Sequence, residues 1–289
     1  MSPAITVVVP SYNPAPDLLR ALYDSLCQQT FTNFEVIIVD DASRHGPYDC
    51  ITDPRFRVLY QEENRGPAAC RNAGARAAQS ACIFFTDTDC QLAPDTLANT
   101  VAAMREEDIV MGNTVTKAAT RFGKAVALLG FPGGGILGFD KVWRVNAAGY
   151  TNSISSCSVA FRKTVFERLG RFDESFPVAG GEDTVLARHA IEAGYRIRYV
   201  PGQRVYHVEK RRLRDFLRWQ IVRGRGNFHI RRRVRRVGSY LWLRVWTFKN
   251  SLTAAGPLYA LPVLALIVLS VVYQSVGYYL EKMRHSREP

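Results

Sequence analysis

The sequence lacks the cysteine patterns of a disulfide-rich or zinc-binding protein. Its six cysteines lie singly along the 289 residues, and no two of them form a CxxC pair. Several fall within apolar or helical stretches, so we interpret them as reduced thiols of a cytosolic domain. The first residues lack a charged segment followed by an apolar one. We therefore expect no signal peptide there.

A glycine-rich phosphate loop is also missing. The first apolar run, Ile5 to Val9, is followed by the segment PSYNP at residues 10–14. The one glycine-rich break, FPGGG at residues 131–135, lacks the lysine and the strand–helix context that a phosphate loop requires. Nucleotide binding of the kind that depends on such a loop is therefore not expected.

Charged residues are absent from a long C-terminal stretch, Ser251 to Leu280. Within it, the 23 residues from Leu258 to Leu280 would form roughly 35 Å of helix, enough to cross the hydrocarbon core of a bilayer. A core helix of a globular domain is the alternative, but the length and apolarity of the run favour the membrane. We predict a transmembrane helix over residues 251–280 and a short tail over 281–289.

The segment before this stretch is strongly basic, in a chain whose formal net charge is +12. Lys210 to Arg236 contains twelve Lys and Arg residues but only one acid, Asp215, and apolar residues are interleaved. A basic amphipathic arm over residues 210–250 is typical of a membrane surface, so we expect an anionic membrane as partner. Basic stripes also bind nucleic acids, but the adjacent apolar run decides against nucleic acid. The preceding domain should face the cytoplasm at the inner membrane.

Residues 1–209 alternate between strand-like and helix-like segments. Continuous apolar runs at Ile5 to Val9, Glu35 to Val39 and Ile83 to Phe85 predict strands that are buried on both faces. Amphipathic or alanine-rich segments at Asp17 to Gln29 and Ala68 to Ala78 predict the helices between them. Such alternation predicts an α/β domain with a mostly parallel sheet flanked by helices.

Acidic residues follow two of these strands directly. Asp40 and Asp41 end the second strand, and Asp87-Thr88-Asp89 follows the run at Ile83 to Phe85. Ligands of open parallel sheets bind at the carboxyl ends of the strands. Alternation along an extended chain lets Asp87 and Asp89 point to one side, where two carboxylates suit Mg²⁺ or Mn²⁺. A simple turn is the alternative, since Asp and Thr favour turns.

The order and spacing of four motifs decide between these interpretations. They are VPSYN at residues 9–13, VDDAS at 39–43, an NRG segment at 64–66 followed by Arg71-Asn72 and Gly74, and DTD at 87–89. Together they resemble the family 2 glycosyltransferases, inverting enzymes of the GT-A fold, over about residues 4–210. The resemblance implies that the glycine-rich segment 131–135 is a flexible loop on the acceptor side.

The resemblance also implies roles for the matching positions, which are donor-binding residues. Pro10 and Tyr12 would line the pocket for the nucleotide base, and Asp41 would hydrogen-bond the base, with Asp40 close by. A carboxylate suits uracil, because the ring offers an N–H donor at its edge. The remaining roles are those of Arg71 toward the diphosphate, Asp87 toward the ribose and Asp89 toward the metal.

Two further positions take roles from the same resemblance. Glu182 and Asp183 open a predicted helix, where acidic residues also serve simply to stabilise the helix dipole. In the family pattern this stretch carries the catalytic base, which falls on Asp183, with Glu182 in support. His207 would complete the metal site with Asp89, although a lone histidine is often only a packed residue. A nitrogen ligand favours Mn²⁺ over Mg²⁺.

We therefore expect a metal-dependent inverting glycosyltransferase that takes a nucleotide-sugar donor, UDP-linked by preference. Its acceptor would be a lipid-linked saccharide or polyprenyl phosphate, in cell-surface glycan assembly. One alternative is a membrane-anchored scaffold with an inactive fold, against which the intact set Asp41, Asp87, Asp89 and Asp183 speaks. The other is a nucleotidyltransferase that makes nucleotide sugars, which would depend on the missing glycine-rich loop.

Overall fold

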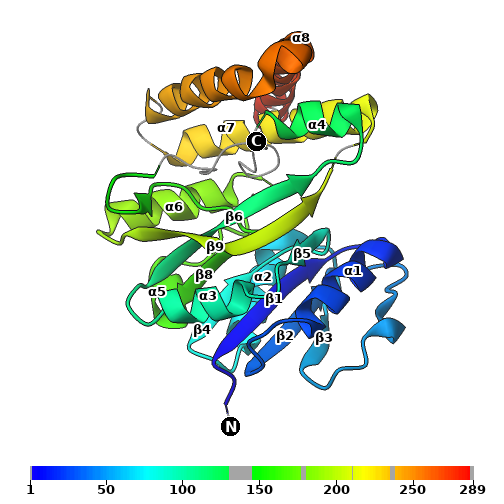
Figure 1. The fold of residues 1–289 in the computed structure, drawn as a ribbon, viewed down its shortest axis with the longest axis vertical. Helices are drawn as coiled ribbons and strands as arrows, with labels where there is room; N and C mark the ends of the chain where they lie inside the picture. The colour runs from blue at the N-terminus through cyan, green and yellow to red at the C-terminus, as the bar shows by residue number, and fades with distance from the viewer. Residues whose placement is uncertain (1, 130–144, 177–179, 210, 235–237, 287–289) are drawn as a thin grey trace.

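A computed structural model describes residues 2–129, 145–176, 180–209, 211–234 and 238–286. The glycine-rich segment 131–135, with its predicted acceptor-side loop, lies outside these residues. Nine strands form a single sheet whose main path runs β3-β2-β1-β4-β8-β6-β9-β5, with β7 paired to β9. Helices flank the sheet, and three further helices gather at the end of the molecule opposite the N-terminus (Figure 1). The predicted α/β class is confirmed.

The first half of the sheet is parallel and carries the predicted strands. β1 (Ile5–Ser11) pairs in parallel with β2 (Phe34–Asp40) and β4 (Cys82–Phe85), and β2 pairs in parallel with β3 (Phe56–Tyr60). Every residue of β2 is buried, as expected of a continuous apolar run covered on both faces. The carboxyl ends of these strands therefore share one edge of the sheet.

The second half is mixed. β8 (Val159–Arg162) is antiparallel to both β4 and β6 (Ile109–Lys117), while β6 is parallel to the long β9 (Ile197–Val208). Two short strands, β5 (Cys90–Leu92) and β7 (Tyr150–Thr151), add antiparallel pairs to β9. The predicted parallel arrangement thus holds for the N-terminal half, and the insertion of β8 reverses direction beyond β4.

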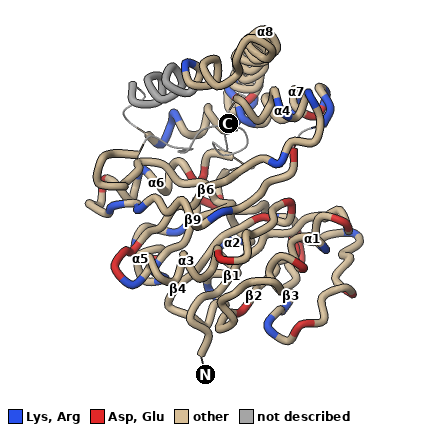
Figure 2. The backbone as a smooth tube through the Cα atoms, viewed as in Figure 1, with Lys and Arg blue, Asp and Glu red and all other residues tan. Residues whose placement is uncertain are grey.

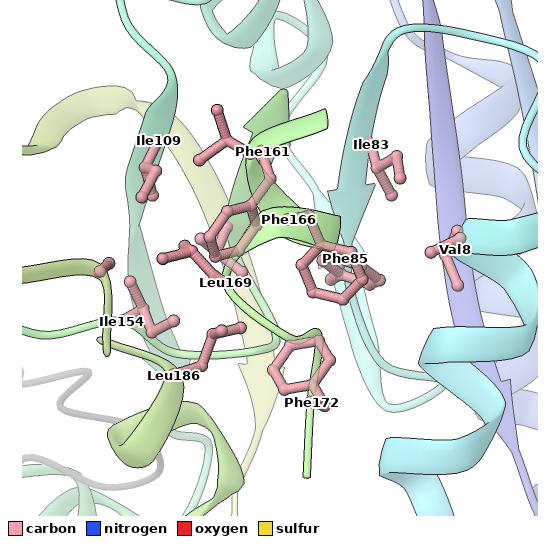
Figure 3. Close-up of a cluster of buried hydrophobic side chains, with 14 of the residues drawn as sticks. Val8, Ile83, Phe85, Ile109, Ile154, Phe161, Phe166, Leu169, Phe172 and Leu186 are labelled. Carbon is pink, nitrogen blue, oxygen red and sulfur yellow. The ribbon is translucent and has the colours of Figure 1, made fainter. Parts of the chain in front are cut away.

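Helices cover both faces of the sheet. α1 (Pro16–Cys27) and α3 (Thr96–Ala103) lie on one side, and α2 (Gly66–Ala77), α5 (Lys163–Arg168) and α6 (Glu182–Glu192) on the other, with a short 3₁₀ turn at Tyr48–Cys50. The core on the second side is centred on an aromatic group in which the rings of Phe85, Phe161, Phe166 and Phe172 lie 5.1–6.2 Å apart (Figure 3). Phe85 ends β4, so this packing fixes the strand that leads into Asp87.

A helical layer closes the end of the domain. It consists of α4 (Arg121–Ala127), α7 (Leu213–Arg233) and α8 (Gly238–His285), and α8 is broken at Gly256, which has φ +60° and is followed by Pro257. Among the described residues one helical segment, Phe248–His285, is long and apolar enough to be a candidate membrane span, and it includes a window of 18 residues with a mean hydropathy of 2.2. It contains the whole of the predicted range 251–280.

The basic arm differs from its prediction in one respect. The apolar residues Phe216 and Phe228 of α7 are buried, Phe216 against α4 and α8 and Phe228 against the ring of Tyr278. Phe216 and Phe228 therefore pack on protein and do not face lipid. The periodicity of apolar residues in the sequence indicates that one face of the helix is removed from water. It does not show whether lipid or a neighbouring helix packs on that face.

Candidate active site

Asp87 and Asp89 follow the carboxyl end of β4, at the sheet edge where the sequence predicts the ligand site. They occupy the short connection between β4 and β5, which is held to β1 by the Thr86 N–H donating to the Val8 carbonyl at 3.2 Å. Antiparallel pairing of β5 with β9 sets Cys90 directly opposite His207. As a result Asp89 Oδ1 lies 3.3 Å from His207 Nε2. Residues 118 positions apart are thus brought together, as the sequence predicts.

The hydrogen bonding of His207 suits metal binding. Its Nδ1 lies 2.9 Å from the Val208 carbonyl oxygen, which only accepts hydrogen bonds, so Nδ1 is the donor of that bond. Nε2 lies on the side of Asp89 and is the ring nitrogen that would bind a metal, and metal-bound histidines usually donate such a bond from their other nitrogen. One carboxylate oxygen and one imidazole nitrogen fit Mn²⁺ or Mg²⁺, with Mn²⁺ favoured by the nitrogen. Cys90 Sγ also lies within 4.8 Å of these two ligand atoms.

Arg71 joins the two acidic motifs of the site. Its guanidinium donates from Nη2 to Asp87 Oδ1 at 2.7 Å and from Nη1 to Glu182 Oε1 at 3.1 Å. The residue comes from α2 and is only 4% exposed. Burial opposes its charge, but the carboxylates of Asp87 and Glu182 outweigh burial and raise the pKa of Arg71. The sequence assigns Arg71 to the diphosphate, whereas the structure places it between the strand end and the start of α6.

We predict that Arg71→Met costs about 3–5 kcal/mol of unfolding free energy, because it leaves the buried carboxylate of Glu182 and the partly buried carboxylate of Asp87 without their cation. Equilibrium urea unfolding followed by circular dichroism measures this loss. Arg76→Met in the same helix is the matched control, since the Arg76 side chain is 48% exposed and lies 3.8 Å from Glu174. It should cost under about 1 kcal/mol. Equal losses in the two variants would show that Arg71 is not the central cation of the site.

Glu182 and Asp183 start α6 after two glycines with positive φ, Gly180 and Gly181. Glu182 is buried, and its Oε2 accepts from the Gly180 N–H at 2.9 Å. Asp183 is half-buried, and its Oδ1 accepts from the Thr184 N–H at 2.7 Å. Burial raises the pKa of both carboxyls, and the charge of Asp183 adds to the effect on Glu182. A carboxylate with a raised pKa is suited to accept a proton.

The residues expected to line the base pocket divide into two kinds. Tyr12 is 55% exposed beyond the buried part of β1, with Pro10 partly covered, so an aromatic face is available for stacking. Asp41 is buried and accepts from the N–H groups of Arg65 and Gly66, both at 2.8 Å. It therefore anchors the start of α2. Any bond from a base must use a remaining lone pair of Asp41.

Asp40 has a structural role in the described site. Its side chain accepts from the Tyr48 hydroxyl at 2.7 Å and from the Ser43 N–H at 3.1 Å. The Tyr48 hydroxyl also lies 2.8 Å from Ser11 Oγ, and burial raises the pKa of that phenol. These bonds close the loop after β2 against the end of β1. Asp40 thus holds the floor of the predicted base pocket.

Two positioning residues were not assigned from the sequence. Asn72 donates to the Phe172 carbonyl at 2.8 Å and to Glu174 Oε1 at 2.9 Å, so α2 holds the loop that leads toward α6. From the other side, Arg233 of α7 donates to Asp173 Oδ2 at 2.5 Å. Asn72 belongs to the motif that follows NRG, and Arg233 belongs to the basic segment before the apolar stretch. Their partners lie 100 and 60 positions away in the sequence.

Comparison with known proteins agrees with this geometry. The family model "Glycosyl transferase family 2" matches residues 6–170. The succinoglycan biosynthesis protein ExoO of Rhizobium meliloti is 29% identical over 75% of this chain and 64% of its own length. The putative teichuronic acid biosynthesis glycosyltransferase TuaG of Bacillus subtilis is 34% identical over 39% of this chain and 46% of its own length. The chain thus spans less than two thirds of each of these relatives.

Solved structures share the fold. A mannosyltransferase from Pyrobaculum calidifontis, in complex with GDP-Man and Mn²⁺, superposes with a TM-score of 0.63 at 23% identity, covering 99% of this chain and 85% of its own. The S. aureus protein TarS, in a structure of its residues 1–349, gives a TM-score of 0.56 at 17% identity, covering 99% of this chain and 92% of its own. At these identities the likeness is one of fold.

Proposed function

This chain belongs to glycosyl transferase family 2, and on that premise we propose that it transfers a sugar from a nucleotide-sugar donor to a membrane-associated acceptor in cell-surface polysaccharide assembly. The observation that carries the proposal is the buried Arg71, which links the DxD motif through Asp87 to the acidic pair through Glu182. A scaffold protein would not require the carboxylates of Asp41, Asp87, Asp89 and Asp183 together with a buried cation at the same edge of the sheet. The names of the succinoglycan and teichuronic acid relatives support the polysaccharide assignment.

The donor is assigned to the edge formed by the ends of β1, β2 and β4. The exposed ring of Tyr12 is the candidate for stacking on the base, which we take to be uracil, with Asp41 behind it. Asp87, whose side chain is 26% exposed while it pairs with Arg71, faces the expected ribose. The donor in this assignment is a UDP-sugar.

Asp89 and His207 would hold a divalent cation, Mn²⁺ or Mg²⁺, beside the diphosphate. When bound, such an ion supplies positive charge where the leaving diphosphate becomes negative. The part of the protein is to fix the ligand directions, through the Val208 carbonyl for His207 and through the strand end for Asp89. The Mn²⁺ in the structure of the Pyrobaculum calidifontis mannosyltransferase supports this assignment.

Asp183 is the proposed base. It would take the proton from the acceptor hydroxyl as the hydroxyl oxygen attacks the anomeric carbon, which breaks the bond to the diphosphate in a single displacement and inverts the configuration. Glu182 would not touch the reacting atoms, because its carboxylate is bound by Arg71 and by the Gly180 N–H. Its role is to position the start of α6.

The acceptor in this proposal is a lipid-linked saccharide or a polyprenyl phosphate, and the enzyme would work on the cytoplasmic side of the inner membrane. Support comes from the helical layer at the end of the domain, which combines a basic α7 with an apolar α8. Membrane attachment brings the enzyme to the surface where such acceptors lie.

A donor screen tests the function. The full chain is incubated with individual nucleotide sugars and Mn²⁺, and thermal shift and nucleotide release are measured. We expect stabilisation and slow release of nucleoside diphosphate with one UDP-sugar. Pyrophosphate exchange would instead identify a nucleotidyltransferase, and neither stabilisation nor release by any donor would indicate a scaffold. Either result would overturn the proposal.

A further inference from the structure

The part of α8 after its break has two distinct faces. One face is buried, and its members recur three or four residues apart: Val263, Leu266, Ile267, Ser270, Gln274, Gly277 and Glu281. The opposite face is exposed and almost entirely apolar, comprising Leu258, Leu261, Leu264, Val268, Val271, Val272, Val276, Tyr279, Leu280 and Met283. Leu258 is 81% exposed and Leu261 76%. A stripe of this length on a folded surface indicates a contact with another apolar phase.

The buried face is polar where it meets α7. Gln274 Nε2 donates to Gln220 Oε1 at 2.6 Å, and Arg225 Nε donates to Glu281 Oε2 at 2.6 Å. Gly224 of α7 and Gly277 of α8 let the two backbones approach closely, because a β-carbon on either glycine would clash with the other helix. These contacts hold the later part of the segment on α7, and Phe216 of α7 packs in one cluster with Val263 and Leu266 of its earlier part, so α7 and α8 form one packed layer.

Both ends of the segment lie on the same body. Near its start, the Tyr259 ring lies 5.1 Å from Lys124 Nζ of α4. Near its end, Glu281 Oε1 lies 3.0 Å from His229 Nε2 of α7. Helix α7 is in turn fixed to the catalytic domain, since Gly226 packs against the Gly180 carbonyl at the start of α6. In Figure 1, α4, α7 and α8 accordingly lie together at the end of the molecule away from the N-terminus.

This arrangement is incompatible with a perpendicular crossing. The hydrocarbon core of a bilayer is about 30 Å thick, so the two ends of a helix that crosses it lie on opposite sides of the membrane, about that distance apart. If α8 crossed while keeping its contacts, α7 would enter the core with the exposed Arg214, Arg218 and Arg231. Burying arginines in hydrocarbon is strongly unfavourable.

We propose that α8, from Leu258 to Met283, lies in the plane of the membrane with its exposed apolar face inserted into one leaflet, and that the chain does not cross the bilayer there. Charge supports a lipid partner over a second protein chain. The exposed Lys282 and Arg284 lie at the C-terminal end of the apolar stripe, where they suit anionic headgroups. In Figure 2, α7 shows blue segments while the described part of α8 is mostly tan. The proposal rests on the membrane attachment in the proposed function and does not depend on the chemistry.

Labelling from each side of the membrane tests the orientation. Ser286→Cys places a thiol just after α8, and Glu62→Cys places one on the catalytic domain; both positions are exposed. A membrane-impermeant maleimide is applied to inside-out and right-side-out vesicles, and labelling is scored above that of the unaltered chain. We expect both thiols to react in the same vesicle preparation. Reaction in opposite preparations would show that α8 crosses the bilayer and would overturn the proposal.

Vesicle binding tests the surface itself. The full chain should float with vesicles of phosphatidylethanolamine and phosphatidylglycerol at high salt, because the attachment is hydrophobic. Leu261→Glu should weaken binding about tenfold or more. Tyr60→Glu is the matched control, since Tyr60 is 69% exposed on β3, and it should bind normally. Thermal unfolding confirms that both variants are folded. A chain that stays off vesicles and forms a dimer in solution would assign the stripe to a second copy, while sugar transfer could still be intact.

Discussion

Asp183→Asn should lower kcat by about 10²–10⁴-fold with little change in donor affinity. The amide is nearly isosteric with the carboxylate and can still accept from the Thr184 N–H, but it cannot take the proton of an acceptor hydroxyl. Donor affinity should persist because Asp87, Asp89 and Arg71 are unchanged. Single-turnover transfer and donor titration measure the two quantities separately.

The control for this change is Asp95→Asn, because Asp95 is exposed and makes no side-chain capping bond at the start of α3. It should retain full activity. A hydroxyl acceptor glycosylated at the normal rate by Asp183→Asn would remove Asp183 from the role of base. Normal transfer to a phosphate acceptor would identify that acceptor class instead, since a phosphate is already ionised.

The pH dependence of kcat provides an independent check on the same residue. Burial raises the pKa of Asp183 above the ordinary value of an aspartate, about 3.9. A base acts only when deprotonated, so kcat should fall as the pH drops through this raised pKa, and the acid limb should lie above about pH 4. In Arg71→Met the limb should move to still higher pH, because the charge of Arg71 lowers the pKa of Asp183. An unmoved limb would assign it to another group.

Asp89→Ala should reduce donor turnover at least about 100-fold and remove the effect of Mn²⁺ on nucleotide binding. The change deletes the carboxylate that lies 3.3 Å from His207 Nε2 and leaves the imidazole alone as a protein ligand. Calorimetric titration of UDP with and without Mn²⁺ measures the loss. The wild-type enzyme should lose activity in EDTA and regain it with Mn²⁺.

A suitable control for the metal experiment is Asp215→Ala, which removes an exposed acid in the first turn of α7. Its turnover and its response to EDTA should match those of the wild type. Equal activity of Asp89→Ala in buffers with and without EDTA, at the wild-type rate, would contradict the metal role of Asp89.

Much of the N-terminal half could be predicted from the sequence because its signals are local. Each buried strand is a continuous apolar run, and the acidic residues that follow it must reach the same sheet edge when the strands are parallel. Thus the strand predicted at Glu35 to Val39 lies within β2 (Phe34–Asp40), and Asp89 meets His207 as expected. The antiparallel direction of β8 could not be predicted in this way, because the sequence of a short apolar strand does not indicate whether the strand runs parallel or antiparallel to its neighbours.

The hydrogen bonds and ion pairs of the site could not be predicted, because they join residues that are distant in the sequence. Nothing local to Arg71 indicates that its guanidinium is buried between Asp87 and Glu182, the latter 111 positions away. The same limit applies to α7 and α8. Apolar periodicity indicated two membrane-facing segments, whereas Phe216 and Phe228 of α7 are buried against its neighbours, and residues 258–283 of α8 expose one apolar face.

The contact between Gly226 and the Gly180 carbonyl has a consequence for acceptor length. It sets α6, with Asp183 at its start, directly beneath α7, and α7 separates it from α8. Packed helices lie about 8–10 Å apart. With α8 inserted in a leaflet, the carboxylate of Asp183 lies about one helix layer above the headgroups. This distance sets how far the reactive group of an acceptor must extend from the membrane surface. Of the two proposed acceptors, this distance therefore favours the lipid-linked saccharide, which carries its sugar on a diphosphate stem, over a polyprenyl phosphate, whose reactive group lies level with the headgroups.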